Sequence, residues 1–381
     1  MHSITGLNVG GAEYMLARFL RCLGQDNYRA AVLSLMTPGP LEVHVAAAGA
    51  SVHSLSMRQG RFSLSSVRSL NGIFQKIKPE LVHGWMYHGN IAASIGCRIG
   101  HLNAPIIWSV HHSLYDIAVE KPLTQKLIRL SARLSNQASA ITYSSYVAAK
   151  QHEAVGFDPR HRVVIHNGID CEEFQPAFPG AKLALAQRLR IPDQRVIIGS
   201  IGRFHPMKDQ ATLVQAFAQL LAEGYDIHGL FVGAGHEDGV VIKTAQQLGI
   251  DDRISTLGAS DDIPAIAPGL DIHAISSAWG ETFSMATAEA MASGVPSLVT
   301  DVGDCALVVG DTGEVVARRD PKALAAALRR LLDLGRDARR QLGARARRRI
   351  VENFSLQRYV DSHVALYQKL HEGRLLKPKQ M

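Results

Sequence analysis

Apolar residues along this chain form short runs that alternate with amphipathic segments. In the first half, runs of strand length lie at 30–35, 51–55, 81–86, 106–111, 140–143 and 162–165. Two intervening segments, 64–77 and 123–134, repeat apolar residues every three or four positions, which is typical of helices. A second series of strand-like runs lies at 196–201, 229–232, 254–257, 272–275, 297–300 and 314–317. This alternation predicts an α/β protein whose parallel sheets carry helices on both faces.

The chain of 381 residues is too long for one ordinary core and suits two domains. The segment between the two series, 171–193, contains three prolines and resembles a connector. We therefore predict a first domain at 1–170 and a second at 171–354. An amphipathic helix is predicted to follow near the end of the chain, at about 355–381.

Composition narrows the class of protein. The content of 46% hydrophobic and 20% charged residues is typical of a soluble globular protein. No run approaches the ~20 apolar residues that span a bilayer, and no basic segment followed by an apolar one begins the chain. The four cysteines lie far apart without metal-ligand spacing, which favours a reducing cytoplasm. We expect a cytoplasmic protein.

The formal net charge of +7 suggests an anionic partner. Much of the excess comes from nine arginines between 329 and 349, in a segment with helical spacing. They could form a solvated helix face or bind an anionic membrane surface, to which Lys377 and Lys379 would add. Aromatic residues do not interleave with them, so we expect no nucleic acid partner.

The stretch 279–303 combines a loop, a helix and a strand. Glu281 stands in a turn with Thr282, Phe283 and Ser284, and the helix that follows carries Glu289. The unpaired amides at a helix N-terminus favour an anion, whereas a carboxylate in the turn can accept hydrogen bonds from hydroxyl groups. The stretch therefore predicts a site for a phosphate together with a polyol.

Two other turns of the second series carry candidate ligand-binding groups. Arg203 and Lys208 follow the run at 196–201, where a guanidinium and an ammonium could hold a diphosphate or could form surface salt bridges. Gly233 follows the run at 229–232. There a glycine either lets a base or phosphate approach the backbone or allows close packing.

The first half contributes two further candidates. Gly10 and Gly11 precede a helix, an arrangement that lets a ligand approach the backbone but that also occurs in a plain tight turn. His111 and His112 stand at the end of a strand-like run. Ligands of parallel sheets bind beyond the carboxyl ends of the strands, so we expect one of these histidines to face a ligand.

Taken together, these residues resemble glycosyltransferase family 4, whose members are retaining enzymes of GT-B fold. The turn at 10–13 resembles the family's GGxE motif, and 167–170 its NG[IV]D motif. Arg203 and Lys208 are similar to its phosphate clamp, and Glu281 and Glu289, with seven residues between them, to its EX7E motif.

The resemblance implies two Rossmann-like domains with parallel sheets facing across a cleft, and a C-terminal helix that packs back on the first domain. Gly10 and Gly11 would lie near the donor diphosphate or the acceptor, and Arg203 and Lys208 would neutralise the diphosphate. Glu281 would bind the donor sugar and Glu289 the ribose. One of the two histidines would touch the sugar, and we choose His112 over His111.

The expected activity is transfer of a sugar from a nucleotide-sugar donor to a glycan or lipid-linked acceptor, in bacterial cell-surface polysaccharide synthesis. We expect no metal and no cofactor, since no DxD-like site is present where one is expected. The alternatives are a GT-B epimerase or phosphorylase, or a non-catalytic protein that binds nucleotide-sugars. The chain departs from the family at Thr282 and Ser284, in a turn that is usually richer in glycine, and at Asp304.

Overall fold

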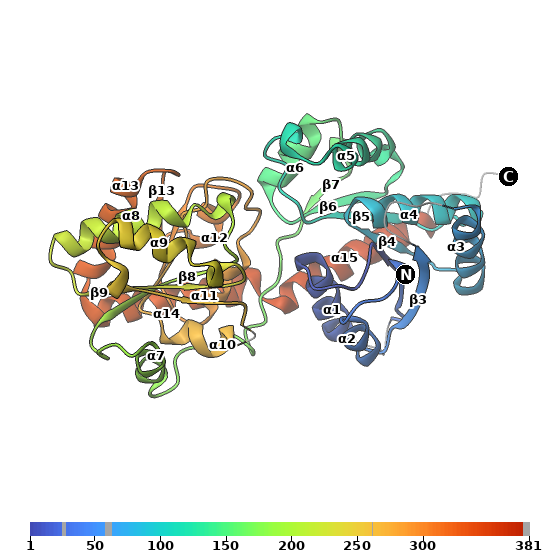
Figure 1. Ribbon diagram of the computed structural model, residues 1–381. Helices are drawn as coiled ribbons and strands as arrows, with labels where there is room; N and C mark the ends of the chain where they lie inside the picture. Colours follow the sequence, from blue (N-terminus) through green and yellow to red (C-terminus); the bar gives the residue numbers. More distant parts are fainter. Residues whose placement is uncertain (25–27, 58–62, 261, 376–381) are drawn as a thin grey trace. The chain divides into compact units, whose positions relative to one another are not determined.

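The computed structural model describes residues 1–24, 28–57, 63–260 and 262–375. The chain divides into two compact units (Figure 1). The first consists of Met1–Gly168 together with the chain from Leu356 onward, and the second of Ile169–Ser355. Each unit is an α/β layer structure of the Rossmann type, with one parallel sheet. The predicted α/β class is confirmed.

The first unit has a seven-stranded parallel sheet in the order β3-β2-β1-β4-β5-β6-β7. Its strands are β1 (His2–Ile4), β2 (Ala31–Met36), β3 (Ser51–Met57), β4 (Val82–Trp85), β5 (Ile106–Val110), β6 (Ala140–Tyr143) and β7 (Arg162–Val164). Its helices are α1 (Gly11–Leu23), α2 (Glu42–Ala47), α3 (Leu64–Ile77), α4 (Met86–Ile99), α5 (Pro122–Leu134), α6 (Tyr146–Ala154) and α15 (Leu356–Leu375).

The second unit has a six-stranded parallel sheet in the order β10-β9-β8-β11-β12-β13. Its strands are β8 (Val196–Ile201), β9 (Ile227–Val232), β10 (Ile254–Leu257), β11 (Ile272–Ala274), β12 (Ser297–Thr300) and β13 (Gly313–Val316). Its helices are α7 (Ala181–Leu189), α8 (Gln210–Ala222), α9 (Val240–Gln247), α10 (Ile263–Ile266), α11 (Met285–Ala292), α12 (Cys305–Val309), α13 (Pro321–Asp333) and α14 (Gly335–Phe354).

Helices cover both faces of the second sheet (Figure 1). Residues of α8, α9 and α13 form one apolar cluster with β8 and β9, with Phe217 and Phe231 at its centre. Residues of α7 and α11 pack on the other face, where α14 adds Ile350 and Phe354. The strands are consequently apolar on both sides, which explains why they read as continuous apolar runs in the sequence.

The strand order reverses direction between β8 and β11 in the second unit and between β1 and β4 in the first. At such a switch point the loops at the carboxyl ends of adjacent strands run to opposite faces of the sheet and leave a ligand-binding crevice. The loops that follow β8 and β11 contain Arg203, Lys208 and Glu281. The topology therefore brings the candidate residues of the second unit to one place.

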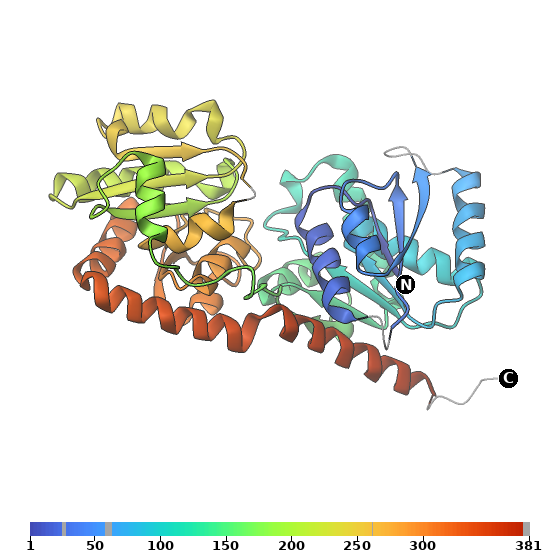
Figure 2. The ribbon, with the colours of Figure 1, turned by 90° about the horizontal axis from the view of Figure 1, so that it is seen from below.

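Seven of the nine arginines lie on α14, the long orange-red helix along one side of the second unit in Figure 2, and the other two, Arg329 and Arg330, lie on α13. Six of the nine arginines between 329 and 349 bond to other residues, most of them to backbone carbonyl oxygens or carboxylates of the same unit. Arg347 Nη1, for example, donates to the carbonyl oxygens of Phe174 and Ala292. Many of these arginines thus attach α13 and α14 to the rest of the unit through hydrogen bonds and ion pairs. The sequence did not predict this structural role.

One expected strand ends earlier than the sequence predicted. The run at 81–86 was expected to be strand throughout, but Met86 begins α4 with a positive φ of 61°. The tail residues Lys377 and Lys379 lie outside the residues that the structure describes. Within the described ranges, no helix combines the length and apolarity required to cross a membrane.

Candidate active site

The loop after β8 holds Lys208 in a defined backbone position. The short helix η4 (Pro206–Lys208) is capped by His205, whose Nδ1 accepts from the amide of Met207 at 3.2 Å. Ser276, which follows β11, donates its hydroxyl to the carbonyl oxygens of Lys208 at 3.0 Å and Asp209 at 2.8 Å. These hydrogen bonds connect the loop after β11 to the loop after β8 at the switch point.

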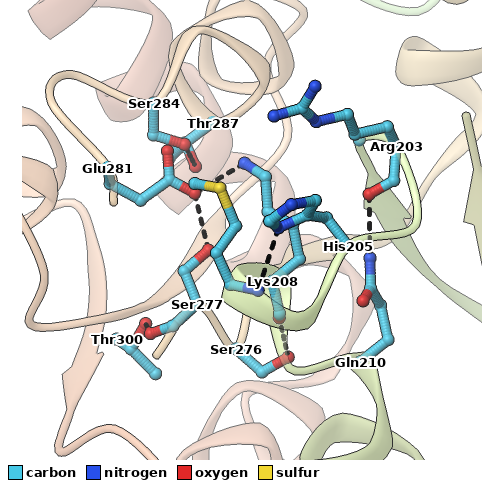
Figure 3. A network of polar contacts seen from close by, with 12 residues as sticks. Arg203, His205, Lys208, Gln210, Ser276, Ser277, Glu281, Ser284, Thr287 and Thr300 are labelled. Carbon is cyan, nitrogen blue, oxygen red and sulfur yellow. Dashed lines mark hydrogen bonds and ion pairs between the residues drawn. The ribbon is translucent and has the colours of Figure 1, made fainter. Parts of the chain in front are cut away.

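Lys208 and Glu281 form an ion pair at the centre of the site (Figure 3). The ammonium Nζ lies 2.6 Å from Glu281 Oε1, and the same oxygen accepts from the Ser277 hydroxyl at 2.6 Å. Among the residues that the structure describes, Glu281 Oε2 has no hydrogen-bond partner. Glu281 is therefore held rigidly through one oxygen while the other can accept a hydrogen bond from a ligand.

Burial makes this pair electrostatically strong. The side chain of Glu281 is 7% exposed and that of Lys208 is 19% exposed. Few waters can screen such a pair, and removal of one partner leaves a buried charge. The pair also affects its surroundings, because burial, and to a lesser extent Lys208, lower the pKa of His273 in β11 to about 3. The ring of His273 is consequently neutral near pH 7.

Arg203 extends from the start of the same loop (Figure 3). Its side chain is exposed and, in the described chain, makes no hydrogen bond or ion pair. The surface salt bridge considered as an alternative is therefore absent for Arg203. Its carbonyl oxygen accepts from Gln210 Nε2 at 3.1 Å, which anchors the backbone while leaving the guanidinium available.

Gly233 supports the position of Arg203 by close packing. A Cβ at Gly233 would lie 2.4 Å from the carbonyl oxygen of Gly202 and 2.8 Å from the amide nitrogen of Arg203, and its φ is +145°. The glycine is thus required where the loops after β8 and β9 meet. Of the two interpretations of Gly233, the structure supports close packing, and its contact with a donor stays a prediction.

The turn before α11 packs against the residues that follow β12. A Cβ at Gly303 would lie 2.4 Å from the carbonyl oxygen of Glu281, and the amide of Asp304 donates to the carbonyl oxygen of Thr282 at 2.8 Å. Ser284 is the N-cap residue of α11 with a positive φ of 59°, and its hydroxyl bonds to Thr287 at 2.8 Å.

Phe283 differs from its neighbours in this turn. Its side chain is fully buried against Phe354 of α14, with ring centroids 5.3 Å apart. Only its backbone could reach a ligand. Glu289 lies on α11 and is half-buried, so the expected placement of Glu281 in the loop and Glu289 on the helix is confirmed.

In the first unit, the Gly10-Gly11 turn begins α1. Gly10 is the N-cap residue and provides no side-chain cap, and a Cβ at Gly11 would meet no atom within 4 Å. A Cβ at Gly10 would lie 2.3 Å from a carboxylate oxygen of Glu13. The helix N-terminus therefore has open space beside Gly11, through which a ligand could approach its amides.

His112 lies in a chain of hydrogen-bonding groups. His152 Nδ1 is 2.8 Å from the carbonyl oxygen of Ala148, which can only accept, so this nitrogen carries the proton. His152 Nε2 then accepts from the Tyr87 hydroxyl at 2.6 Å, and Tyr87 accepts from His112 Nδ1 at 3.0 Å. The remaining nitrogen of His112 is 3.3 Å from Glu120. Burial lowers the pKa of His112, whereas Glu120 raises it.

His111 is oriented differently. Its ring stacks on Trp85 at 5.3 Å, and Nδ1 lies 3.1 Å from Asn167 Oδ1, which can only accept. Nδ1 therefore carries the proton and Nε2 has the lone pair. Nε2 has no hydrogen-bond partner within the part of the chain that the structure describes. Burial lowers the pKa of His111 to about 4, so its ring is neutral near pH 7.

Sequence reasoning missed the groups that orient these side chains. Ser276, Ser277 and Trp85 received no role, and Asn167 was noted only as part of a motif. The serines follow β11 after one residue, Ile275, so the rule that placed His111 at a strand end could have found them. In the described ranges, no group of three or more His, Cys, Asp or Glu side chains is arranged to hold a metal ion, and a metal-free reaction stays a prediction.

Comparisons with known proteins agree with this architecture. A family model described as "Glycosyl transferases group 1" matches residues 182–349, and one described as "Glycosyltransferase Family 4" matches residues 9–173. The HepE protein of Anabaena, solved in complex with UDP, superposes with a TM-score of 0.82 at 20% identity, covering 97% of this chain and 99% of that one. That likeness concerns the fold, which is GT-B.

Two relatives connect the sequence to characterised activities. An MMP α-(1→4)-mannosyltransferase of Mycolicibacterium hassiacum is 31% identical over 301 residues, which are 74% of this chain and 70% of the relative. A D-inositol 3-phosphate glycosyltransferase of Salinispora tropica is 32% identical over 227 residues, 55% of this chain and 46% of the relative. Fold and sequence together define a glycosyltransferase enzyme. The chain belongs to glycosyltransferase family 4.

Proposed function

We propose that this enzyme is a retaining glycosyltransferase that moves a sugar from a nucleotide-sugar to a glycan or lipid-linked acceptor in bacterial cell-surface polysaccharide synthesis. The observation that carries the proposal is the divided environment of Glu281. One carboxylate oxygen is fixed by Lys208 and Ser277, and the other is unpartnered among the described residues. A donor with a diphosphate and a polyol would use both halves of this arrangement.

The diphosphate would be held by the loop after β8. Lys208 uses one ammonium hydrogen on Glu281, so two others can bond phosphate oxygens. The guanidinium of Arg203 can add a planar, two-pronged contact. Together they would neutralise the charge that grows on the leaving group, a task for which many transferases use a metal. Glu289, one helix further on, would bind the ribose.

In the reaction, the bond between the anomeric carbon and the diphosphate oxygen breaks, and a bond from the acceptor hydroxyl to that carbon forms. For retention, the acceptor attacks from the face that the diphosphate leaves, and its proton passes to a leaving phosphate oxygen. Glu281 Oε2 would hold a hydroxyl of the transferred sugar during this step. His111 is favoured over the His112 of the sequence analysis as the histidine that contacts the sugar, because its Nε2 is unengaged in the described structure.

The donor can be identified by its effect on stability. A ligand that binds only the folded protein raises its apparent stability by about 2.7 kcal/mol at a hundred times Kd. We would measure thermal unfolding with UDP-, GDP- and ADP-sugars, starting with UDP because HepE was solved with it. Stabilisation by one of these donors, followed by transfer of its radiolabelled sugar, supports the proposal, whereas the absence of stabilisation by every donor contradicts it.

A further inference from the structure

A second cluster of cations lies in the same unit as Arg203 and Lys208, the proposed donor clamp, but at the opposite edge of the sheet. A cavity of about 310 Å³ opens beside the residues that precede β11 and β12, namely Asp271 and Pro296. Ser277 and Glu281, by contrast, lie beyond the carboxyl end of β11. The cavity is therefore separate from the site described above. Its volume is near the lower end of the ~300–1,000 Å³ usual for small-molecule pockets.

The walls of this cavity differ in character. Four cationic side chains line it, three of them from the first turns of α14: Lys182, Arg336, Arg339 and Arg340. The arginines stand at positions i, i+3 and i+4 and so share one face of the helix. The other wall is apolar and rigid, formed by Pro176, Pro268, Leu270 and Pro296.

The charges in the cavity are not balanced by the protein. Lys182 is paired with the one carboxylate of the lining, that of Asp271, at 2.5 Å. Asp271 also accepts from the amide of Ile197 at 2.8 Å. Arg336 and Arg340 are exposed and, so far as the structure describes the chain, form no hydrogen bond or ion pair. An excess of three positive charges therefore faces the cavity.

Arg339 is the most buried of the three arginines that line the cavity. It is only 7% exposed, and its Nη1 donates to the carbonyl oxygen of Leu332 at 2.9 Å, at the end of α13. Burial and the nearby Arg336 lower the pKa of Arg339, while Asp271 raises it. Within the described ranges, its Nε and Nη2 have no hydrogen-bond partner. These two open donors can therefore bond an anionic acceptor that enters the cavity.

The opposing wall is held in place by α14. A Cβ at Gly343 would clash with the Gly294 carbonyl oxygen, so the helix packs directly on the turn that leads to Pro296. Because the cationic and apolar walls belong to one packed assembly, the cavity does not need to form on binding. Preorganisation of this kind reduces the entropic cost of binding.

We propose that this cavity binds the phosphate group of a small organic phosphate monoester, with Arg336, Arg339 and Arg340 on the phosphate and the carbon portion against the prolines and Leu270. The monoester could be a free metabolite or the headgroup of a lipid. The site lies outside the proposed donor clamp and would serve as a separate phosphate sensor or anchor.

The test uses the full chain carrying Arg203→Ala in every protein compared, so that phosphate binding by the donor clamp is weakened equally in all of them. Glycerol 3-phosphate is titrated by calorimetry into this parent, into the parent with Arg336→Gln and Arg340→Gln, and into a control with Lys322→Gln and Arg348→Gln. The control removes two charges from α13 and α14 outside the cavity. We expect glycerol 3-phosphate to bind the protein with Arg336→Gln and Arg340→Gln at least about tenfold more weakly than the parent, and to bind the control as tightly as the parent.

The source of the phosphate is distinguished with vesicles of phosphatidylcholine that contain phosphatidic acid. Binding to vesicles that depends on Arg336 and Arg340 assigns a lipid, and binding to glycerol 3-phosphate alone assigns a free metabolite. The proposal is overturned if the parent and the protein with Arg336→Gln and Arg340→Gln bind equally well, or if the parent binds neither glycerol 3-phosphate nor the vesicles. In that case the role of Arg339 is confined to the end of α13.

Discussion

Glu281 is buried, and its Oε1 is paired with the ammonium of Lys208, so a substitution of Lys208 should lower the stability of the protein. Lys208→Met removes the counter-charge and leaves a carboxylate that is 7% exposed. We expect a loss of roughly 3 kcal/mol in the free energy of unfolding, because an unpaired buried charge is costly. The double variant with Glu281→Gln should recover part of this loss. Urea denaturation of the four proteins in the cycle measures the coupling, and equal losses in the single and double variants would contradict a buried pair.

Substitutions of the adjacent residues His111 and His112 should affect sugar transfer to different extents. His111→Asn should lower kcat/KM for sugar transfer by about 100-fold, the usual scale for loss of a polar group at a reacting centre. His112→Asn, which alters a side chain bonded to Tyr87 and Glu120, should cost less than tenfold. His88→Asn, at an exposed position on α4, is the control. Steady-state kinetics with the identified donor decide, and a larger effect at His112 would restore the sequence-based choice.

At the scale of elements, two helical glycines distinguish the effect of close packing from that of helix propensity. A Cβ at Gly343 on α14 collides with the Gly294 carbonyl oxygen, whereas one at Gly72 on α3 meets nothing within 4 Å. Gly343→Ala should therefore destabilise the protein by about 1–3 kcal/mol through overpacking. Gly72→Ala should be neutral or stabilise by about 0.5–1 kcal/mol. Thermal unfolding checks both signs, and a loss at Gly72 equal to that at Gly343 would refute the packing argument.

The elements themselves could be predicted well from the sequence. The expected helix at 64–77 coincides with α3, and Asp320 caps α13 through the amide of Ala323 with Pro321 in the first turn. Buried parallel strands bring continuous apolar runs, and caps have short-range signatures, so both appear in the local sequence. β9 begins two residues before its expected start, because His228 interrupts the apolar run and yet is buried with a bond to Ser255.

The contacts that make the site could not be predicted in the same way. Ser277 and Lys208 meet Glu281 only because the chain reverses at the switch point, which is a property of the whole sheet. His83, within β4, bonds to Tyr367 of α15 at 2.7 Å, a partner 284 positions away in the sequence. The partners of Arg347 and Arg349 are likewise distant in sequence.

At the scale of the whole molecule, buried histidines make stability depend on pH. Burial lowers the pKa of His111, His152 and His363 in the first unit and of His228 in the second, each to about 4. The unfolded chain takes up these protons near pH 6.5 and the folded chain does not, so stability is complete above pH 6.5 and declines toward pH 4. Urea midpoints at pH 7 and pH 5 should therefore differ, with the lower midpoint at pH 5. Equal midpoints would show that these histidines are accessible to protons.

The two units divide the candidate chemistry between them. The second unit carries the cations and carboxylates that we propose bind a nucleotide-sugar, and the first carries the Gly10-Gly11 turn and His111. Arg203 offers the most direct test, because its guanidinium is exposed and forms no hydrogen bond or ion pair with the described chain. Its removal should leave stability within about 0.5 kcal/mol and affect function alone.

The decisive measurement is therefore transfer of radiolabelled sugar from the identified donor by the intact protein, by Arg203→Ala and by Arg348→Ala, which removes an exposed charge elsewhere in the same unit. We predict turnover by the intact protein and the control, and a loss of about 100-fold in kcat/KM for Arg203→Ala without a change in thermal unfolding. Equal turnover by all three proteins would contradict the proposed diphosphate clamp.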